Sequence, residues 1–266
     1  MQLKRLHNEV VRTDWATAKA KRSLIANSNV VLDFFGDDTD IRSIDYKRVT
    51  EFVDKLRSKG LSGSTINRKL SCLSKLYTIA RRHDKKITRI EIPLQKEGKP
   101  RQRIFSNDEA NALVSADWHR PEWRDLTVLL MDTGIRPGEI VQGKWSVDGD
   151  EITLFDTKNG DDRTLVLTPD AKAAAVRLRK LFDAGGHITY SKYFEGFTKA
   201  RKAAGLGDDA VPYIMRHTAI TRLAEATDNV ILIQKWAGHK NLQTTQRYVK
   251  ATRKGMENLA NLLVRK

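Results

Sequence analysis

The sequence predicts a mainly α-helical protein of two domains, a small all-helical N-terminal domain and a larger mixed α domain with a small antiparallel β-sheet. Along most of the chain, apolar residues recur at three- and four-residue spacing, which places them on one face of an α-helix. Between residues 151 and 167 the apolar spacing changes to two, which is typical of β-strands. Residues 93–104 are basic, contain two prolines and predict a linker between the domains.

The composition indicates a globular protein without a structural metal or disulfide. Its 266 residues are 40% hydrophobic and 30% charged, enough to bury the cores of two modest domains. No apolar run approaches the ~18 residues of a membrane-spanning helix, and the N-terminus lacks a signal-peptide core, so we expect a cytoplasmic protein. The single cysteine, Cys72, excludes an internal disulfide, and the six histidines show no metal-ligand spacing. We therefore expect no cofactor and no metal.

The net charge of +15 predicts a polyanionic partner, and double-stranded DNA is favoured over a membrane surface. Between residues 68 and 103 there are twelve Lys or Arg against three acidic residues. A solvated helix face is the alternative explanation, but so one-sided an excess favours contact with phosphates. The residues expected to bind DNA are Arg68, Lys69, Arg81, Arg82, Lys85, Lys86, Lys99, Arg101 and Arg103.

The first domain, residues 1–92, should contain three to four helices. One is predicted from about residue 13 to residue 35. A second follows the cap candidate Asp45 and stops at Gly60, and a third begins after Ser64, each with apolar residues at helical spacing. Basic residues occupy the polar faces of these helices, which suits a DNA-binding domain.

The second domain, residues 105–250, opens with a capping box formed by Ser106 and Glu109. Strands at residues 151–155 and 163–167 flank a polar turn that contains Lys158, which is the pattern of a β-hairpin. The remaining segments are predicted to be helical, at residues 122–132, at 137–143 and from 169 onward. Breaks are expected at Gly185-Gly186, Gly205-Leu206-Gly207 and Gly238. Residues 251–266 form a separate C-terminal tail with an apolar helical face.

Four short motifs supply groups that attack a phosphodiester without a metal. Arg136 follows Thr133-Gly134-Ile135, Arg216 follows Tyr213-Ile214-Met215, His239 follows Gly238, and Tyr248 comes nine residues later. Arginine offers a permanently charged fork for phosphate oxygens, and an activated tyrosine hydroxyl can form a covalent intermediate. Together they indicate cleavage of DNA strands.

In this order and spacing the motifs resemble the tyrosine recombinase, or phage integrase, family. The resemblance covers residues 106–250 through these motifs, and the helical N-terminal domain with its linker is similar to that family's core-site DNA-binding domain. It implies that Arg136 and Arg216 bind the scissile phosphate, and that His239 hydrogen-bonds it and helps to deprotonate the nucleophile. Tyr248, expected on a partly exposed helix, is implied to attack phosphorus, leaving a 3′-phosphotyrosyl link and a free 5′ hydroxyl.

Two supporting roles follow. A lysine on the hairpin turn is implied to protonate the leaving 5′ oxygen, and we choose Lys158 over Lys144. Glu139 lies three residues after Arg136, on the same helical face, and is expected to orient a neighbouring catalytic side chain.

The chain departs from the family pattern at Tyr213, where the family usually has histidine three residues before the second arginine. Tyrosine can donate a hydrogen bond to a phosphate oxygen, but its pKa of ~10 makes it a poor proton shuttle at neutral pH. Tyr213 is therefore a site residue whose role stays open. His217 is four residues out of register, and we interpret it as structural.

The resemblance implies a site-specific DNA recombinase or integrase, as in viral genome integration. It would act as a homotetramer through a Holliday junction, without metal or ATP, with an accessory DNA-bending or directionality factor as a further partner. In that family the tail, here residues 251–266, docks on a neighbouring protomer, although it can also fold back on its own domain. The segment before Trp15 is too short for an additional arm-site domain. The alternatives are a type IB topoisomerase that relaxes DNA as a monomer and a DNA-binding protein that has lost catalysis.

Overall fold

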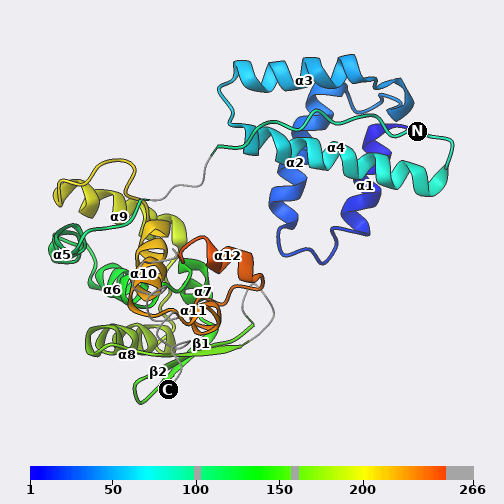
Figure 1. Cartoon of the computed structure of the whole chain (residues 1–266). Helices are drawn as coiled ribbons and strands as arrows, with labels where there is room; N and C mark the ends of the chain where they lie inside the picture. Colours follow the sequence, from blue (N-terminus) through cyan, green and yellow to red (C-terminus); the bar gives the residue numbers. More distant parts are fainter. Residues whose placement is uncertain (99–102, 157–161, 250–266) are drawn as a thin grey trace, which may run out of the picture. The chain divides into compact units, whose positions relative to one another are not determined.

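A computed structural model describes residues 1–98, 103–156 and 162–249. The chain divides into two compact units, Met1–Pro100 and Arg101–Lys266 (Figure 1). The prediction of a mainly α protein with a small antiparallel sheet is confirmed. Within the described ranges, none of the helices is long and apolar enough to cross a bilayer.

The first unit is helical throughout. Its elements are α1 (Leu3–Arg12), α2 (Lys21–Phe35), a 3-10 turn (Ile41–Ser43), α3 (Tyr46–Ser58) and α4 (Gly63–His83). The long helix α4 packs against the other three and supplies much of the apolar core, including the buried Cys72 and Tyr77. Asp45 caps α3 as predicted, by accepting a hydrogen bond from the backbone N of Arg48. Ser62 rather than Ser64 caps α4.

The helix predicted from residue 13 was wrong at its start, because α1 ends at Arg12 and α2 begins only at Lys21. Long-range contacts explain the break. The Asp14 carboxylate accepts hydrogen bonds from Arg82, at 2.7 and 3.0 Å, and from Lys75, so it is tied to α4. These bonds hold the pKa of Asp14 well below its ordinary value. Trp15, the next residue, is buried, and the chain turns here with hydrogen bonds from Trp15 N to Val10 O and from Ala16 N to Thr13 O.

The second unit surrounds helix α6 (Pro121–Thr133), which packs along α8 (Pro169–Asp183) and α10 (Pro212–Ala226). The predicted capping box of Ser106 and Glu109 opens α5 (Asn107–Ser115). The other helices are α7 (Pro137–Val141), α9 (Tyr190–Ala203), α11 (Val230–Ala237) and α12 (Leu242–Gln246).

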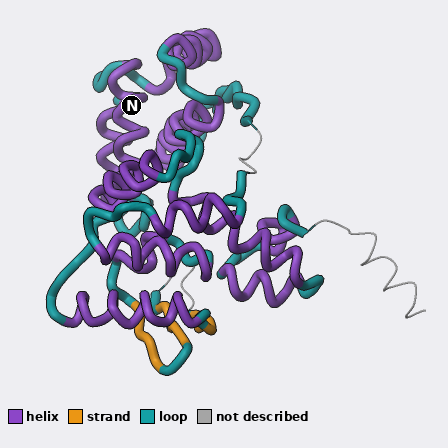
Figure 2. Tube along the Cα trace, turned by 90° about the vertical axis from the view of Figure 1, so that its left-hand side faces the viewer, coloured by secondary structure: helices purple, strands orange, loops and turns teal. Residues whose placement is uncertain are grey.

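The sheet has three antiparallel strands rather than the predicted two: β1 (Trp145–Asp148), β2 (Glu151–Leu154) and β3 (Arg163–Val166), in the order β1-β2-β3. Figure 2 shows the strands in orange at one edge of this unit. Leu154 pairs with Arg163 across the predicted hairpin, so β3 begins with Arg163.

Candidate active site

Arg136 stands at a rigid junction between two helices. Helix α6 ends at Gly134, whose φ of +68° is the left-handed conformation that favours glycine, and Pro137 begins α7. The Arg136 backbone N donates to Glu139 Oε2 at 3.0 Å, and its Nη1 donates to Glu139 Oε1 at 3.0 Å. The Arg136 side chain keeps 23% of its surface exposed, so its guanidinium is held in place and still accessible.

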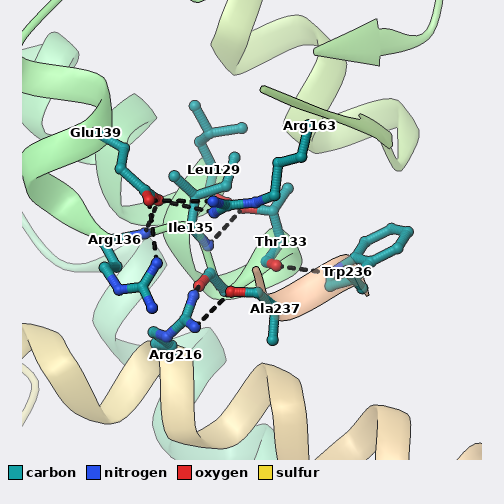
Figure 3. Close-up of polar contacts among 10 residues, drawn as sticks. Leu129, Thr133, Ile135, Arg136, Glu139, Arg163, Arg216, Trp236 and Ala237 are labelled. Atoms are coloured by element: carbon teal, nitrogen blue, oxygen red, sulfur yellow. Dashed lines mark hydrogen bonds and ion pairs between the residues drawn. The ribbon is translucent and has the colours of Figure 1, made fainter. Parts of the chain in front are cut away.

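Glu139 is shared between two arginines (Figure 3). Arg163 reaches it from β3, with Nη1 at 3.1 Å from Oε1 and Nη2 at 2.7 Å from Oε2. Burial alone would raise the pKa of Glu139, but the hydrogen bonds and charges of Arg163 and Arg136 outweigh burial and lower it. Glu139 is therefore ionised and orients Arg136, which is the expected kind of support. Arg163 was not predicted, since its partner lies far away in sequence.

Arg216 is almost fully buried, with 2% of its surface exposed. Its Nη1 donates to Gly134 O at 2.7 Å and its Nη2 to Ala237 O at 2.6 Å (Figure 3). Burial and the nearby charge of Arg136 lower the pKa of Arg216 to about 10, so it remains positive at neutral pH. Arg216 thus joins α10 to the ends of α6 and α11.

His239 follows the turn that ends α11. Gly238 adopts a left-handed φ of +60°, and a Cβ added there would lie 2.6 Å from Arg163 Nη1. His239 Nδ1 lies 2.9 Å from Oγ1 of the fully buried Thr245. Burial and the charges of Arg216, Arg136 and Arg163 lower the pKa of His239 to about 4, so its imidazole is neutral at pH 7.

Tyr248 lies in the turn that follows α12 rather than on a helix as predicted, and it is half-buried, in line with the predicted partial exposure. Its ring packs against the apolar cluster of Ile220, Ile233 and Ala237. Its ring is also stacked on that of His239, with centroids 6.2 Å apart and planes 18° apart. Burial and the charge of Tyr213 raise the pKa of Tyr248, opposed in part by Arg216, Arg247 and Arg136.

The Tyr248 hydroxyl is 2.7 Å from His217 Nδ1, within hydrogen-bond distance. His217, which we interpreted as structural, thus lies directly against the predicted nucleophile. Tyr213 is 51% exposed, and its ring meets that of His217 edge to face, with centroids 4.9 Å apart. The four predicted residues Arg136, Arg216, His239 and Tyr248 thus converge, with Tyr213 at the margin.

The predicted lysine, Lys158, lies outside the described residues. The alternative, Lys144, is exposed and forms an ion pair with Asp156, with Nζ 2.6 Å from Oδ2. No group of His, Cys, Asp or Glu side chains suited to hold a metal ion occurs in the ranges that the structure describes.

The residues predicted to bind DNA differ in their availability. Arg68, Arg81, Lys85 and Lys86 are exposed, whereas Lys99 and Arg101 lie outside the described ranges. Lys69 does not project into solvent as expected: it is 8% exposed, and its Nζ donates to Asn27 Oδ1 at 3.2 Å.

Two further arginines of that set are engaged with acidic residues. Arg82 is paired with Asp14. Arg103 lies 2.7 Å from Glu109 and 2.5 Å from Asp209. These pairs use donors that a phosphate would otherwise occupy.

Comparison with protein families resolves the membership of the chain. The model described as phage integrase family matches residues 103–254, and the one described as phage integrase, N-terminal SAM-like domain matches residues 18–84. The chain belongs to the phage integrase family. This integrase-family chain is 25% identical to tyrosine recombinase XerA of Saccharolobus solfataricus, over 82% of the chain and 77% of that protein. It is likewise 25% identical to tyrosine recombinase XerD of Caulobacter vibrioides, over 84% and 82% of the two proteins.

Solved integrase structures show the same fold. The Tn1549 transposon integrase in complex with transposon right end DNA superposes with a TM-score of 0.77 at 20% identity, over 99% of each chain. A lambda integrase tetramer bound to a Holliday junction gives a TM-score of 0.73 at 17% identity, over 94% of this chain and 78% of that one. The predicted enzyme class, a tyrosine-type site-specific DNA recombinase, is confirmed by the family and its named members.

Proposed function

We propose that this integrase-family protein cleaves and rejoins double-stranded DNA through a covalent 3′-phosphotyrosyl bond at Tyr248. The observation that carries the proposal is the convergence of Arg136, Arg216 and His239 around Tyr248. They come from separate elements: the junction before α7, helix α10 and the turn after α11. A phenol stacked on a neutral imidazole and surrounded by guanidinium groups suits transesterification at a phosphodiester.

The two arginines supply positive charge near Tyr248. A guanidinium has five N–H donors, and Arg216 uses donors on both Nη atoms for Gly134 and Ala237, which leaves others for phosphate oxygens. Arg136 is steered by Glu139 and remains partly exposed. Both charges stabilise the negative charge that grows on phosphoryl oxygens as phosphorus becomes pentacovalent.

His239 and Lys158 complete the proposed chemistry. When His239 Nδ1 accepts a hydrogen bond from the Thr245 hydroxyl, Nε2 carries the ring proton and can donate a hydrogen bond to a phosphate oxygen. Lys158 protonates the leaving 5′ oxygen. The Tyr248–phosphate ester preserves the phosphodiester energy, so religation requires neither ATP nor metal.

DNA binding and assembly belong to the same proposal. We assign residues 1–92 and the linker 93–104 to core-site binding, mainly through the exposed Arg68, Arg81 and Lys85, and residues 105–250 to catalysis. The lambda integrase tetramer on a Holliday junction supports assembly as a homotetramer that exchanges strands through that junction. The tail, residues 251–266, which lies outside the described residues, would dock on a neighbouring protomer. The reaction would serve viral genome integration, with an accessory DNA-bending or directionality factor as a further partner.

A nicked substrate tests the proposal. When a nick lies next to the scissile phosphate, the short 5′ fragment diffuses away and traps the covalent protein–DNA adduct. We expect the wild-type protein to form this adduct in EDTA and without ATP, and Tyr248→Phe to form none. An adduct in Tyr248→Phe would place the nucleophile elsewhere, and no adduct with wild type would leave only DNA binding. Relaxation of plasmids without a defined site would indicate the topoisomerase alternative.

A further inference from the structure

His217 contacts the reacting atom of the proposed nucleophile. It lies on α10 directly after Arg216 and is half-buried, and its Nδ1 is 2.7 Å from the Tyr248 hydroxyl. That separation is typical of a strong O–H···N hydrogen bond. A base must lie within such reach of the proton it removes, and His217 satisfies this condition without any rearrangement of the chain.

His239, the other imidazole beside Tyr248, is arranged differently. Its Nδ1 is engaged by Thr245 at 2.9 Å, and its ring lies nearly parallel to the phenol, with an interplanar angle of 18°. A stacked imidazole presents its π face to its neighbour, whereas its nitrogen lone pair lies in the ring plane. His239 is therefore placed for the phosphate, and His217 for the phenolic proton.

We propose that His217 accepts the proton of Tyr248 when the phenolic oxygen attacks the scissile phosphate. This inference rests on the proposed function. The Tyr248 O–H bond breaks as Nδ1–H forms, the Oη–P bond forms, and the P–O5′ bond breaks. The 5′ oxygen takes its proton from the general acid, which we assign to Lys158. The positive charge on the imidazolium returns to neutral when the proton goes back during religation.

The surroundings keep His217 able to accept a proton. Burial and the charge of Arg216 lower its pKa below the ordinary value, so its imidazole is neutral at pH 7 and keeps a free lone pair. The groups that face it are Tyr213 and Arg216 from α10, Tyr248 from the turn after α12 and His239 from the turn after α11. None of these is an acid that would hold the proton on His217.

The Tyr213 side chain packs against His217 on the same helix. Residues four apart share one face of a helix, so Tyr213 and His217 stand one turn apart on α10. The Tyr213 ring meets the imidazole edge to face, with an interplanar angle of 78°, and limits the ring positions that His217 can adopt. The imidazole that the chain lacks at position 213 is supplied one turn later.

The test measures how single-turnover cleavage depends on pH. The nicked substrate carries sulfur in place of the scissile 5′ oxygen, because a thiolate leaves without protonation and the rate then reports removal of the Tyr248 proton. We expect the wild-type rate to be constant between about pH 7 and 9, because His217 is already unprotonated. In His217→Gln the rate at pH 7 should fall by about 10²- to 10⁴-fold and then rise about tenfold per pH unit, as phenolate forms in solution equilibrium.

His239→Gln is the matched control, since it should slow cleavage and leave the flat pH profile unchanged. Equal urea midpoints of wild type and His217→Gln, followed by the tryptophan fluorescence of the second unit, would show that the variant is folded. A flat profile in His217→Gln, or a wild-type rate that climbs tenfold per pH unit from 7 to 9, would overturn the inference. The second outcome needs no variant. Either result leaves the proposed function intact as long as the adduct depends on Tyr248.

Discussion

Replacing Arg163 with methionine should destabilise the second unit through the loss of one buried ion-pair partner. Arg163 has only 10% of its side chain exposed and donates to both carboxylate oxygens of Glu139. Methionine fills similar space without charge, so the change isolates the guanidinium. Glu139 would keep one nearby partner, Arg136, for its buried negative charge.

The structure sets the size of the effect. Breaking a buried ion pair by removing one partner costs about 3–5 kcal/mol of unfolding free energy. Two features reduce this cost: Glu139 keeps the Nη1 and backbone N–H of Arg136, each at 3.0 Å, and the buried Nε of Arg163 has no hydrogen-bond partner to lose. We therefore expect a smaller loss than this range, about 2–3 kcal/mol.

Urea unfolding followed by tryptophan fluorescence is a suitable assay, because four of the five tryptophans belong to this unit: Trp118, Trp123, Trp145 and Trp236. A double-mutant cycle with Glu139→Gln should give a coupling energy above about 1 kcal/mol. The lowered pKa of Glu139 means that its stabilisation is present above the unfolded-state pKa and is lost as pH falls through the folded-state pKa. The difference in unfolding free energy between wild type and Arg163→Met should therefore become smaller as the pH is lowered. A loss below about 0.5 kcal/mol, or additive single effects, would refute the reasoning.

Three more outcomes are expected. Folding lowers the pKa of His239 from ~6.5 to about 4, so between these pH values the unfolded chain binds more protons than the folded one. The urea midpoint should therefore decrease as the pH is lowered from 6.5 to 4, and His239→Gln should flatten this dependence. Gly238→Ala should lower stability by at least about 1–2 kcal/mol in urea unfolding and slow adduct formation, because the left-handed backbone is strained and the new Cβ displaces Arg163. Lys85→Gln should reduce the salt dependence of DNA affinity by about one unit of slope, whereas Arg82→Gln, whose side chain is already paired, should reduce it less.

Local signals predicted much of the helical fold. The helix that contains Val49, Phe52, Val53 and Leu56 has its apolar stripe, its cap and its glycine stop within one short segment, and it forms as predicted. The start of α2 was wrong because its position depends on Asp14 reaching Arg82 and Lys75 across the unit. Strand β1 was missed because only its pairing with β2 identifies it.

In the candidate site, too, local motifs could be predicted, whereas residues placed by long-range contacts could not. Arg136, Arg216, His239 and Tyr248 stand in recognisable motifs, and the structure brings them together. Arg163 sits in an ordinary strand, and only its contact with Glu139 reveals it. His217 was judged by its spacing along the chain, whereas its contact with Tyr248 depends on a turn 31 residues away.

The burial of Arg216 has a practical consequence for genetic screens. Its guanidinium donates hydrogen bonds to the carbonyls of Gly134 and Ala237, and so connects α10 to the ends of α6 and α11. A null phenotype at this codon therefore mixes misfolding with lost chemistry, and the two cannot be told apart from recombination frequency alone. An investigator who wants an inert, DNA-bound decoy should alter Tyr248 and leave Arg216 in place.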